Sequence, residues 1–193
     1  MRANAVKMAP MIGNHLALDL LNTQARSHGE AIDYWNSGED VLAWLERHNA
    51  VPPSLARKAI DRPALLASGK ALRALAHRLI LRFKKGSAVD ADRLNTFLHA
   101  YRTAPHLERD AAGHLVLTRI AQGEPTASLL GPVAEAVARL LIEGDPTRIK
   151  QCEHPDCVLW FYDRTKARKR RWCSMAVCGN RCKAARFRER SGG

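Results

Sequence analysis

Four cysteines near the C-terminus have the spacing of a tetrahedral metal site. They form two pairs with the same separation, Cys152-x4-Cys157 and Cys173-x4-Cys178, and fifteen residues lie between the pairs. Structural zinc takes four nitrogen or sulfur ligands in a closed shell, which thiolates on tight turns can supply. All five cysteines of the 193-residue chain lie in its last 42 residues, which disfavours scattered buried thiols. We therefore predict one structural Zn²⁺ held by these four cysteines.

Two further residues are close enough in sequence to reach the same ion. Cys182 lies one helical turn after Cys178 and could replace Cys178 or Cys173 as a ligand. His154 lies inside the first pair. Because four thiolates already close the shell, we favour the two x4 pairs. We interpret Cys182 as a small packing residue or a free thiol.

A disulfide framework is a weaker interpretation of the same cysteines. The N-terminal sequence MRANAVKMAPMIGNH lacks the long apolar core of a signal peptide. Apolar runs such as Leu140-Leu141-Ile142 are broken by charge well before the roughly 20 residues that cross a bilayer. We therefore expect a cytoplasmic protein, in which clustered cysteines are more often metal ligands than disulfides.

Positive charge is concentrated around the cysteines. Residues 148–193 contain 13 Lys and Arg against 4 Asp and Glu, a net charge of +9, whereas residues 1–147 contain 18 against 15, a net charge of +3. Four thiolates on a divalent ion would leave the tail at about +7. Such a density indicates a polyanionic partner, most often nucleic acid. The alternative is a solvated basic face that aids solubility.

The basic residues fall into a loop before the second cysteine pair and a helix after it. On that helix Lys183, Arg186 and Arg190 share one face, which could follow the major groove of duplex DNA. Arginine suits bidentate contact with phosphate or guanine. The candidate nucleic-acid contacts are Arg168, Lys169, Arg170, Arg171, Arg181, Lys183, Arg186 and Arg190.

The order of elements around the cysteines predicts a small zinc-binding fold. The first pair encloses a turn, residues 158–162 suit an apolar strand, and residues 163–171 form the turn and returning limb of a hairpin. Ser174, or alternatively Asn180, caps a basic helix that ends near Arg190. A cysteine-bearing turn (a zinc knuckle), a hairpin and a helix in this order make a treble-clef-like zinc ribbon. Its small core would contain Trp160, Phe161, Tyr162 and Trp172.

The preceding residues predict a mainly α, multihelical domain with a small β-hairpin. Leucine spacing and capping residues predict a helix at 13–24 with Asn14 as its cap, and one at 37–48 capped by Ser37. Arg73 is expected on the outer face of a long helix. The other predicted elements are helices at 54–60, 63–85, 90–101 (capped by Asp90 or Ser87) and 125–143, and a hairpin of 105–110 with 114–120. We place the boundary between two domains so that they span residues 1–147 and 148–193.

Three polar residues interrupt the first apolar segment. Asp19, Asn22 and Thr23 could bind a small effector or satisfy buried backbone groups, and we favour the second interpretation. The eight histidines are scattered, and no Gly-rich phosphate loop or nucleophile–base constellation occurs. The sequence therefore does not indicate an enzyme.

Two motifs resemble parts of known families. The stretch WCSM-x2-CGNR-x-K, Trp172 to Lys183, resembles the CGNR zinc finger, and Cys152-x4-Cys157 completes the cysteine pattern of that family. LALDLLNT, Leu16 to Thr23, is similar to the opening of the ABATE domain that precedes this finger. The resemblance implies a stress-induced transcription regulator with a mostly helical N-terminal domain. Cys182 departs from the pattern, because a small residue is expected there.

These observations favour a zinc-dependent DNA-binding transcription regulator. The expected partner is duplex DNA, and the helical domain could bind a small effector or form a homo-oligomer. An RNA-binding module and a protein-interaction adaptor are the alternatives.

Overall fold

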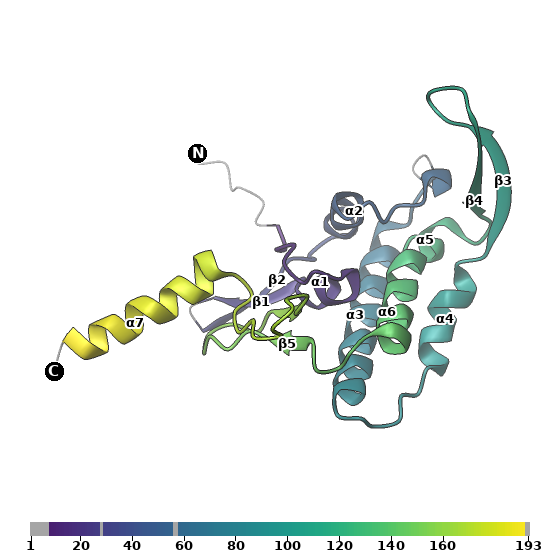
Figure 1. Ribbon diagram of the computed structural model, residues 1–193. Helices are drawn as coiled ribbons and strands as arrows, with labels where there is room; N and C mark the ends of the chain where they lie inside the picture. Colours follow the sequence, from purple (N-terminus) through teal and green to yellow (C-terminus); the bar gives the residue numbers. More distant parts are fainter. Residues whose placement is uncertain (1–7, 28, 56–57, 192–193) are drawn as a thin grey trace, which may run out of the picture. The chain divides into compact units, whose positions relative to one another are not determined.

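The computed structural model describes residues 8–27, 29–55 and 58–191, which form helices and three two-stranded antiparallel sheets (Figure 1). The chain divides into two compact units. The first contains the described residues up to 34 and those from 143 onward, and the second contains residues 35–142. The unit that holds the four cysteines is therefore built from both ends of the chain.

The second unit is organised around the long helix α3 (Arg62–Lys84). Asp61 caps α3 by accepting a hydrogen bond from the amide of Ala64 at 3.0 Å, and Pro63 lies in the first turn. Helices α2 (Gly38–Arg47), α4 (Asp92–Ala100) and α5 (Pro125–Ser128) pack against α3. The predicted helix at 63–85 is confirmed. Four of its leucines are buried along the face that packs into the core: Leu65, Leu72, Leu75 and Leu79.

The predictions for the helix starts in this unit were partly correct. Ser37 caps α2 in a capping box with Asp40, as predicted. The predicted caps Ser87 and Asp90 are wrong, because Ala91 occupies the cap position of α4 and makes no side-chain hydrogen bond there. In place of a helix at 54–60 the structure has a short 3-10 turn, η1 (Pro53–Leu55), and residues 56–57 lie outside the described part of the chain.

The prediction for Arg73 was wrong. This residue is buried in α3, and its guanidinium lies 5.3 Å from the ring centroid of Trp35. A side chain at Gly69, one turn earlier, would approach Trp35, since a Cβ there would lie 3.2 Å from Trp35 Cζ3. The glycine therefore makes room for an indole that Arg73 covers.

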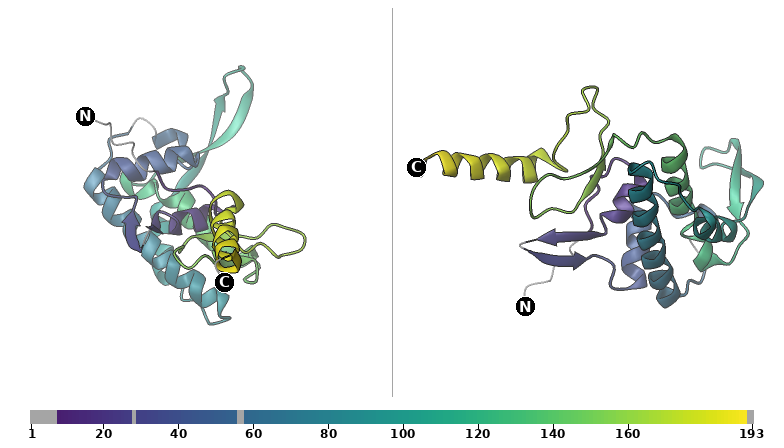
Figure 2. Two further views of the ribbon diagram at one scale, coloured as in Figure 1. Left: turned by 90° about the vertical axis from the view of Figure 1, so that its left-hand side faces the viewer. Right: turned by 90° about the horizontal axis from the view of Figure 1, so that it is seen from below.

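The predicted hairpin is confirmed in the second unit. Strands β3 (Thr103–Arg109) and β4 (Leu115–Ala121) pair antiparallel with Leu107 opposite Leu117. Val116, Thr118 and Ile120 are half-buried on one face, whereas the leucines at 107, 115 and 117 are exposed on the other. Figure 2 shows that this hairpin projects from the helices of its unit. Helix α6 (Gly131–Glu143) follows α5 and completes the predicted helical stretch at 125–143.

The first unit begins with α1 (Leu16–Leu21), whose cap was predicted incorrectly. Asn14 has a left-handed backbone conformation, with φ of 56°, and His15 caps the helix by accepting from the amide of Ala17 at 3.2 Å. The hairpin β1 (Gln24–Ser27) with β2 (Glu30–Asp33) follows, and it was not predicted. Its four-residue strands are too short and too polar to give a clear alternation.

The strand next to the cysteines has a different partner from the predicted one. Strand β6 (Trp160–Tyr162) pairs antiparallel with β5 (Ile149–Gln151), with Ile149 opposite Tyr162. Residues 163–171 form a loop, so the predicted returning limb is wrong. The pairing encloses the first cysteine pair between two strands.

The polar residues of α1 satisfy backbone groups, as we favoured. Asp19 Oδ1 accepts from the amides of Ile12 and Gly13 at 3.0 and 2.7 Å. Asn22 is fully buried and bonds both the amide and the carbonyl of Trp160, at 2.7 and 2.9 Å. Thr23 donates to the carbonyl of Leu20. Asn22 thus joins α1 to β6 across 138 residues of sequence.

Replacing Asn22 with alanine is expected to destabilise the first unit by about 2–3 kcal/mol, because two buried backbone groups of Trp160 lose their partners. The free energy of unfolding, measured by denaturant titration of the zinc-loaded chain, tests this. Gln24→Ala, at an exposed position in β1, is the matched control and should change stability by less than about 0.5 kcal/mol. Equal stability of the two variants would contradict the role of Asn22.

One helical stretch of the described residues, Pro125–Glu143, is long and apolar enough to cross a membrane by length and composition alone. It includes the short apolar run Leu140-Leu141-Ile142, which charged residues flank on both sides. Half of its apolar window is buried inside the protein, as in an ordinary core helix. The stretch is therefore weak evidence for a membrane span.

Candidate metal centre

The four paired cysteines converge on one point. Their sulfur atoms all lie within 4.8 Å of one another. Cys173 Sγ lies 3.7 Å from Cys157 Sγ and 3.5 Å from Cys178 Sγ. Ligands at about 2.3 Å from a tetrahedral zinc ion are about 3.8 Å apart, so these separations suit the ion. Cys182 does not belong to this cluster.

The first pair is positioned by the β5–β6 pairing and a tight turn. The amide of Cys152 donates to the carbonyl of Leu159 at 2.9 Å, which continues the strand pairing past β5. The amide of Cys157 donates to the carbonyl of His154 at 2.9 Å and closes the turn. His154 Nδ1 accepts from the amide of Asp156 at 3.2 Å, so this nitrogen is used within the turn.

The second pair is positioned by a wide helical turn. The amide of Cys173 points at Cys152 Sγ at 3.4 Å and so links the pairs. Ser174 then caps the π-helical turn η2 (Met175–Gly179) by accepting from the amide of Val177 at 3.3 Å, which confirms the predicted capping role. At Gly179 an added Cβ would lie 2.7 Å from Met175 Sδ, so the exposed end of the Met175 side chain would have to move to admit a larger residue. This turn brings Cys178 back toward Cys173 and leads into α7 (Asn180–Ser191).

The thiols cannot all ionise together without a cation. A hydrogen bond from Cys173 is the main reason that the pKa of Cys157 falls to about 5. The bond to Cys157 raises the pKa of Cys173, and burial raises that of Cys178 to about 12. A divalent ion at the centre would favour the thiolate form of all four ligands. The cluster therefore fits one zinc ion with a closed thiolate shell, which is a structural site.

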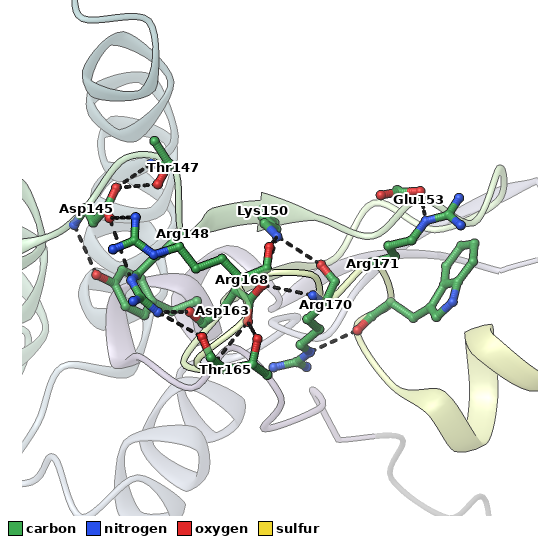
Figure 3. Close-up of polar contacts among 12 residues, drawn as sticks. Asp145, Thr147, Arg148, Lys150, Glu153, Asp163, Thr165, Arg168, Arg170 and Arg171 are labelled. Carbon is green, nitrogen blue, oxygen red and sulfur yellow. Dashed lines mark hydrogen bonds and ion pairs between the residues drawn. The ribbon is translucent and has the colours of Figure 1, made fainter.

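A buried carboxylate holds the loop at 163–171 beside this centre (Figure 3). Asp163 is fully buried and accepts from Lys150 Nζ at 2.8 Å, from the amide of Arg170 at 2.9 Å and from the hydroxyl of Thr165 at 2.6 Å. Lys150 Nζ also donates to the carbonyl of Arg168 at 2.5 Å. The loop is thus tied to β5 by one charged pair.

Arg170, one of the predicted nucleic-acid contacts, lies inside this structure. Its guanidinium donates to the carbonyls of Cys173 and Trp172 at 2.6 and 3.0 Å and lies 4.1 Å from the ring centroid of Phe161. Arg170 therefore positions the backbone at the second cysteine pair. No local sequence pattern indicates this role, because the acceptors are backbone carbonyls.

Two more of the predicted contacts are paired at the surface. Arg168 lies 3.0 Å from Asp145, and Arg171 lies 2.5 Å from Glu153 while its guanidinium covers Trp172. Both arginines remain about half exposed, and such surface pairs are weak and easily exchanged.

The remaining described members of the predicted nucleic-acid contacts, and two further basic residues near the cysteines, are exposed. Within the described part of the chain, five basic side chains near the cysteines make no hydrogen bond or ion pair: Lys166, Lys169, Arg181, Lys183 and Arg188. Three of these were predicted contacts, Lys169, Arg181 and Lys183. The side chains of Arg186 and Arg190 lie outside the described part of the structure. None of the α7 side chains that the structure describes is buried, and Phe187 is 71% exposed.

The predicted aromatic core is confirmed in part. Phe161 and Trp160 are buried, and Trp172 packs half-buried against the cluster of Phe161 and the cysteines. Tyr162 is half-buried, and its hydroxyl accepts from the amide of Asp145 at 3.0 Å.

Comparison with protein families identifies both parts of the chain. The family model described as "Putative stress-induced transcription regulator", ABATE, matches residues 14–144, more than half of the chain. The chain belongs to the ABATE family. The CGNR zinc finger model matches residues 148–191, which follow the ABATE match directly and contain all four clustered cysteines. No curated protein matches the chain. Neither the ABATE nor the CGNR family is an enzyme family.

Proposed function

We propose that this protein is a cytoplasmic DNA-binding transcription regulator. In this proposal residues 148–193 form a treble-clef-like zinc finger that ends in the basic helix α7, and residues 1–147 sense a signal or mediate assembly. The observation that carries the proposal is the set of exposed cations on both sides of the cysteine cluster that have no partner among the described residues. Cations without internal partners are available to phosphates. The family description agrees with this role.

The zinc ion has a structural task in this proposal. It fixes the end of the 163–171 loop and the start of α7 relative to each other, because Cys173 follows the loop and Cys178 precedes the helix. Loop cations at 166 and 169 would contact the phosphate backbone, and α7 would lie in the major groove. The paired Arg168 and Arg171 would join when phosphates replace their weak surface partners.

Charge reversal on α7 is expected to reduce binding to duplex DNA and its salt dependence. In Arg181→Glu/Lys183→Glu, the slope of log affinity against log salt should fall by about 2, because about two phosphate contacts are lost. Fluorescence anisotropy of zinc-loaded protein with duplex DNA over a salt series measures this.

The matched control is Arg78→Glu/Arg93→Glu, which makes the same charge change at exposed positions on α3 and α4. Its slope should stay within experimental error of the native value. An equal loss in the control, or no binding of the native protein at low salt, would contradict the proposed site.

Exposed Phe187 supports a second candidate function, binding of single-stranded nucleic acid. Aromatic side chains stack on unpaired bases and contribute about 1–3 kcal/mol per base. Competition between duplex DNA and structured RNA separates the candidates. If RNA competes better and Phe187→Ala weakens only RNA binding, the RNA-binding module replaces the DNA regulator.

A further inference from the structure

The second unit contains a cavity that is unrelated to the cysteines. Its volume is about 460 Å³, within the usual range of small-molecule sites. It is bordered by residues of α2, by Leu55 of η1 and by Arg62, the first residue of α3. Five apolar side chains form most of its wall: Leu42, Val51, Leu55, Ile60 and Leu129. Such a wall suits a ligand with an apolar body.

Arg62 supplies an unused hydrogen-bond donor at this cavity. Its Nε lies 3.5 Å from Glu39 Oε1, but its Nη1 is buried and has no hydrogen-bond partner among the described residues. Buried donors are nearly always paired, and an unpaired one costs about 1–3 kcal/mol or more when charged. Because Nη1 is buried, an acceptor from a ligand would reach it once the guanidinium turns toward the cavity, and that contact would remove this cost.

The backbone of Arg62 is held firmly. An added Cβ at Gly38 would lie only 2.3 Å from the carbonyl oxygen of Arg62, so the starts of α2 and α3 are in close contact. This contact fixes where the Arg62 side chain begins.

The charges on the cavity wall favour an anion. Among the described residues that line it, two are cations, Arg62 and Lys58, and one is acidic, Glu46, while Glu39 lies outside the lining. A guanidinium and a carboxylate form charge-assisted hydrogen bonds of matching geometry. Because the rest of the described wall is apolar except for Asn49, a carboxylate with an apolar body fits better than a bare phosphate.

We propose that this cavity binds a small organic carboxylate with an apolar body, and that Arg62 Nη1 and Lys58 hold the carboxylate. The proposal goes beyond nucleic-acid binding by the finger. It gives the second unit a ligand site of its own.

Titration of the full, zinc-loaded chain with octanoate and phenylacetate tests the proposal. Octanamide and phenylacetamide are the uncharged counterparts, and inorganic phosphate tests the charge alone. Isothermal titration calorimetry should show saturable binding of at least one carboxylate with a Kd of about 1 mM or below, and at least 10-fold weaker binding of its amide and of phosphate. These titrations contain no DNA, so their outcome does not depend on nucleic-acid binding.

Three variants locate the site. Arg62→Gln should weaken carboxylate binding by about 10-fold or more, because a charge-assisted hydrogen bond is lost. Glu39→Gln is the matched control; it removes the ion-pair partner of Arg62 outside the cavity and should keep native affinity. Val51→Phe, which fills the cavity, should block binding even if Arg62→Gln fails to fold.

The proposal is overturned if no carboxylate probe binds saturably. Equal affinity of acids and amides, or native affinity in both Arg62→Gln and Val51→Phe, would overturn it as well. Loss of DNA binding in the α7 variant leaves these results unaffected, so failure of one proposal is distinguishable from failure of the other.

Discussion

Cys173→Ser is expected to release the zinc and unfold the cysteine-containing part of the first unit. Cys173 has the closest sulfur neighbours in the cluster, and a hydroxyl is a poor replacement for a thiolate on zinc. Zinc binding to such sites contributes on the order of 10–16 kcal/mol of folding free energy, far more than the stability of a domain. Metal analysis should show the loss of one zinc equivalent, and amide hydrogen exchange should rise across residues 149–180.

Cys182→Ser is the matched control, since Cys182 lies outside the cluster. It should keep one zinc equivalent and native exchange rates. Zinc loss in this variant, or retention of zinc in Cys173→Ser, would show that the ligand set is different. Helices of the second unit should remain protected in both variants, because they contain none of the ligands.

Asp163→Asn is expected to destabilise the first unit by about 3 kcal/mol. The change leaves the Lys150 ammonium, only 26% exposed, without its negative partner, and it disturbs hydrogen bonds that hold the loop. Denaturant titration of zinc-loaded protein measures the effect. Asp92→Asn, at an exposed position in α4, is the matched control and should change stability by less than about 0.5 kcal/mol.

The effect of Asp163→Asn should also depend on pH. Burial raises the pKa of Asp163, but hydrogen bonds from Lys150, Thr165 and the Arg170 amide outweigh it and hold the pKa well below its usual range. An aspartate in the unfolded chain titrates near about pH 4, so the stabilisation is complete above that pH and is lost as the pH falls further. The stability difference between native and variant protein should stay constant from neutral pH to about pH 5 and shrink below pH 4. A difference that grows in acid would contradict this assignment.

Local patterns in the sequence predicted the parts of the structure that local interactions determine. Equal cysteine spacings and the turn residues between them predicted the zinc ligands, because each pair closes through contacts a few residues apart. Ser37 and the leucine stripe of α3 predicted two helices for the same reason.

Contacts between residues that lie far apart in the sequence were not predicted. Nothing near Asn22 indicates that it bonds Trp160, and the three residues of β5 are too few to form a recognisable pattern. The loop at 163–171 is a second example. Its positive charge predicted a contact surface for nucleic acid, but the Arg170 side chain hydrogen-bonds to a backbone carbonyl within the protein. Asp163, the one acidic residue of the 163–171 loop, was the available signal that the loop has an internal anchor, but it does not single out Arg170.

The composition of the first unit from both chain ends has a consequence for synthesis. Asn22 leaves the ribosome long before Trp160 exists; at about 5–20 residues per second the delay is roughly 7–28 s. During this time α1 lacks its partner strand, whereas residues 35–142 can already form their own helices. We therefore expect the apolar side chains of α1 to lack their partner strand until β6 has been synthesised, and zinc can join the four cysteines only after that.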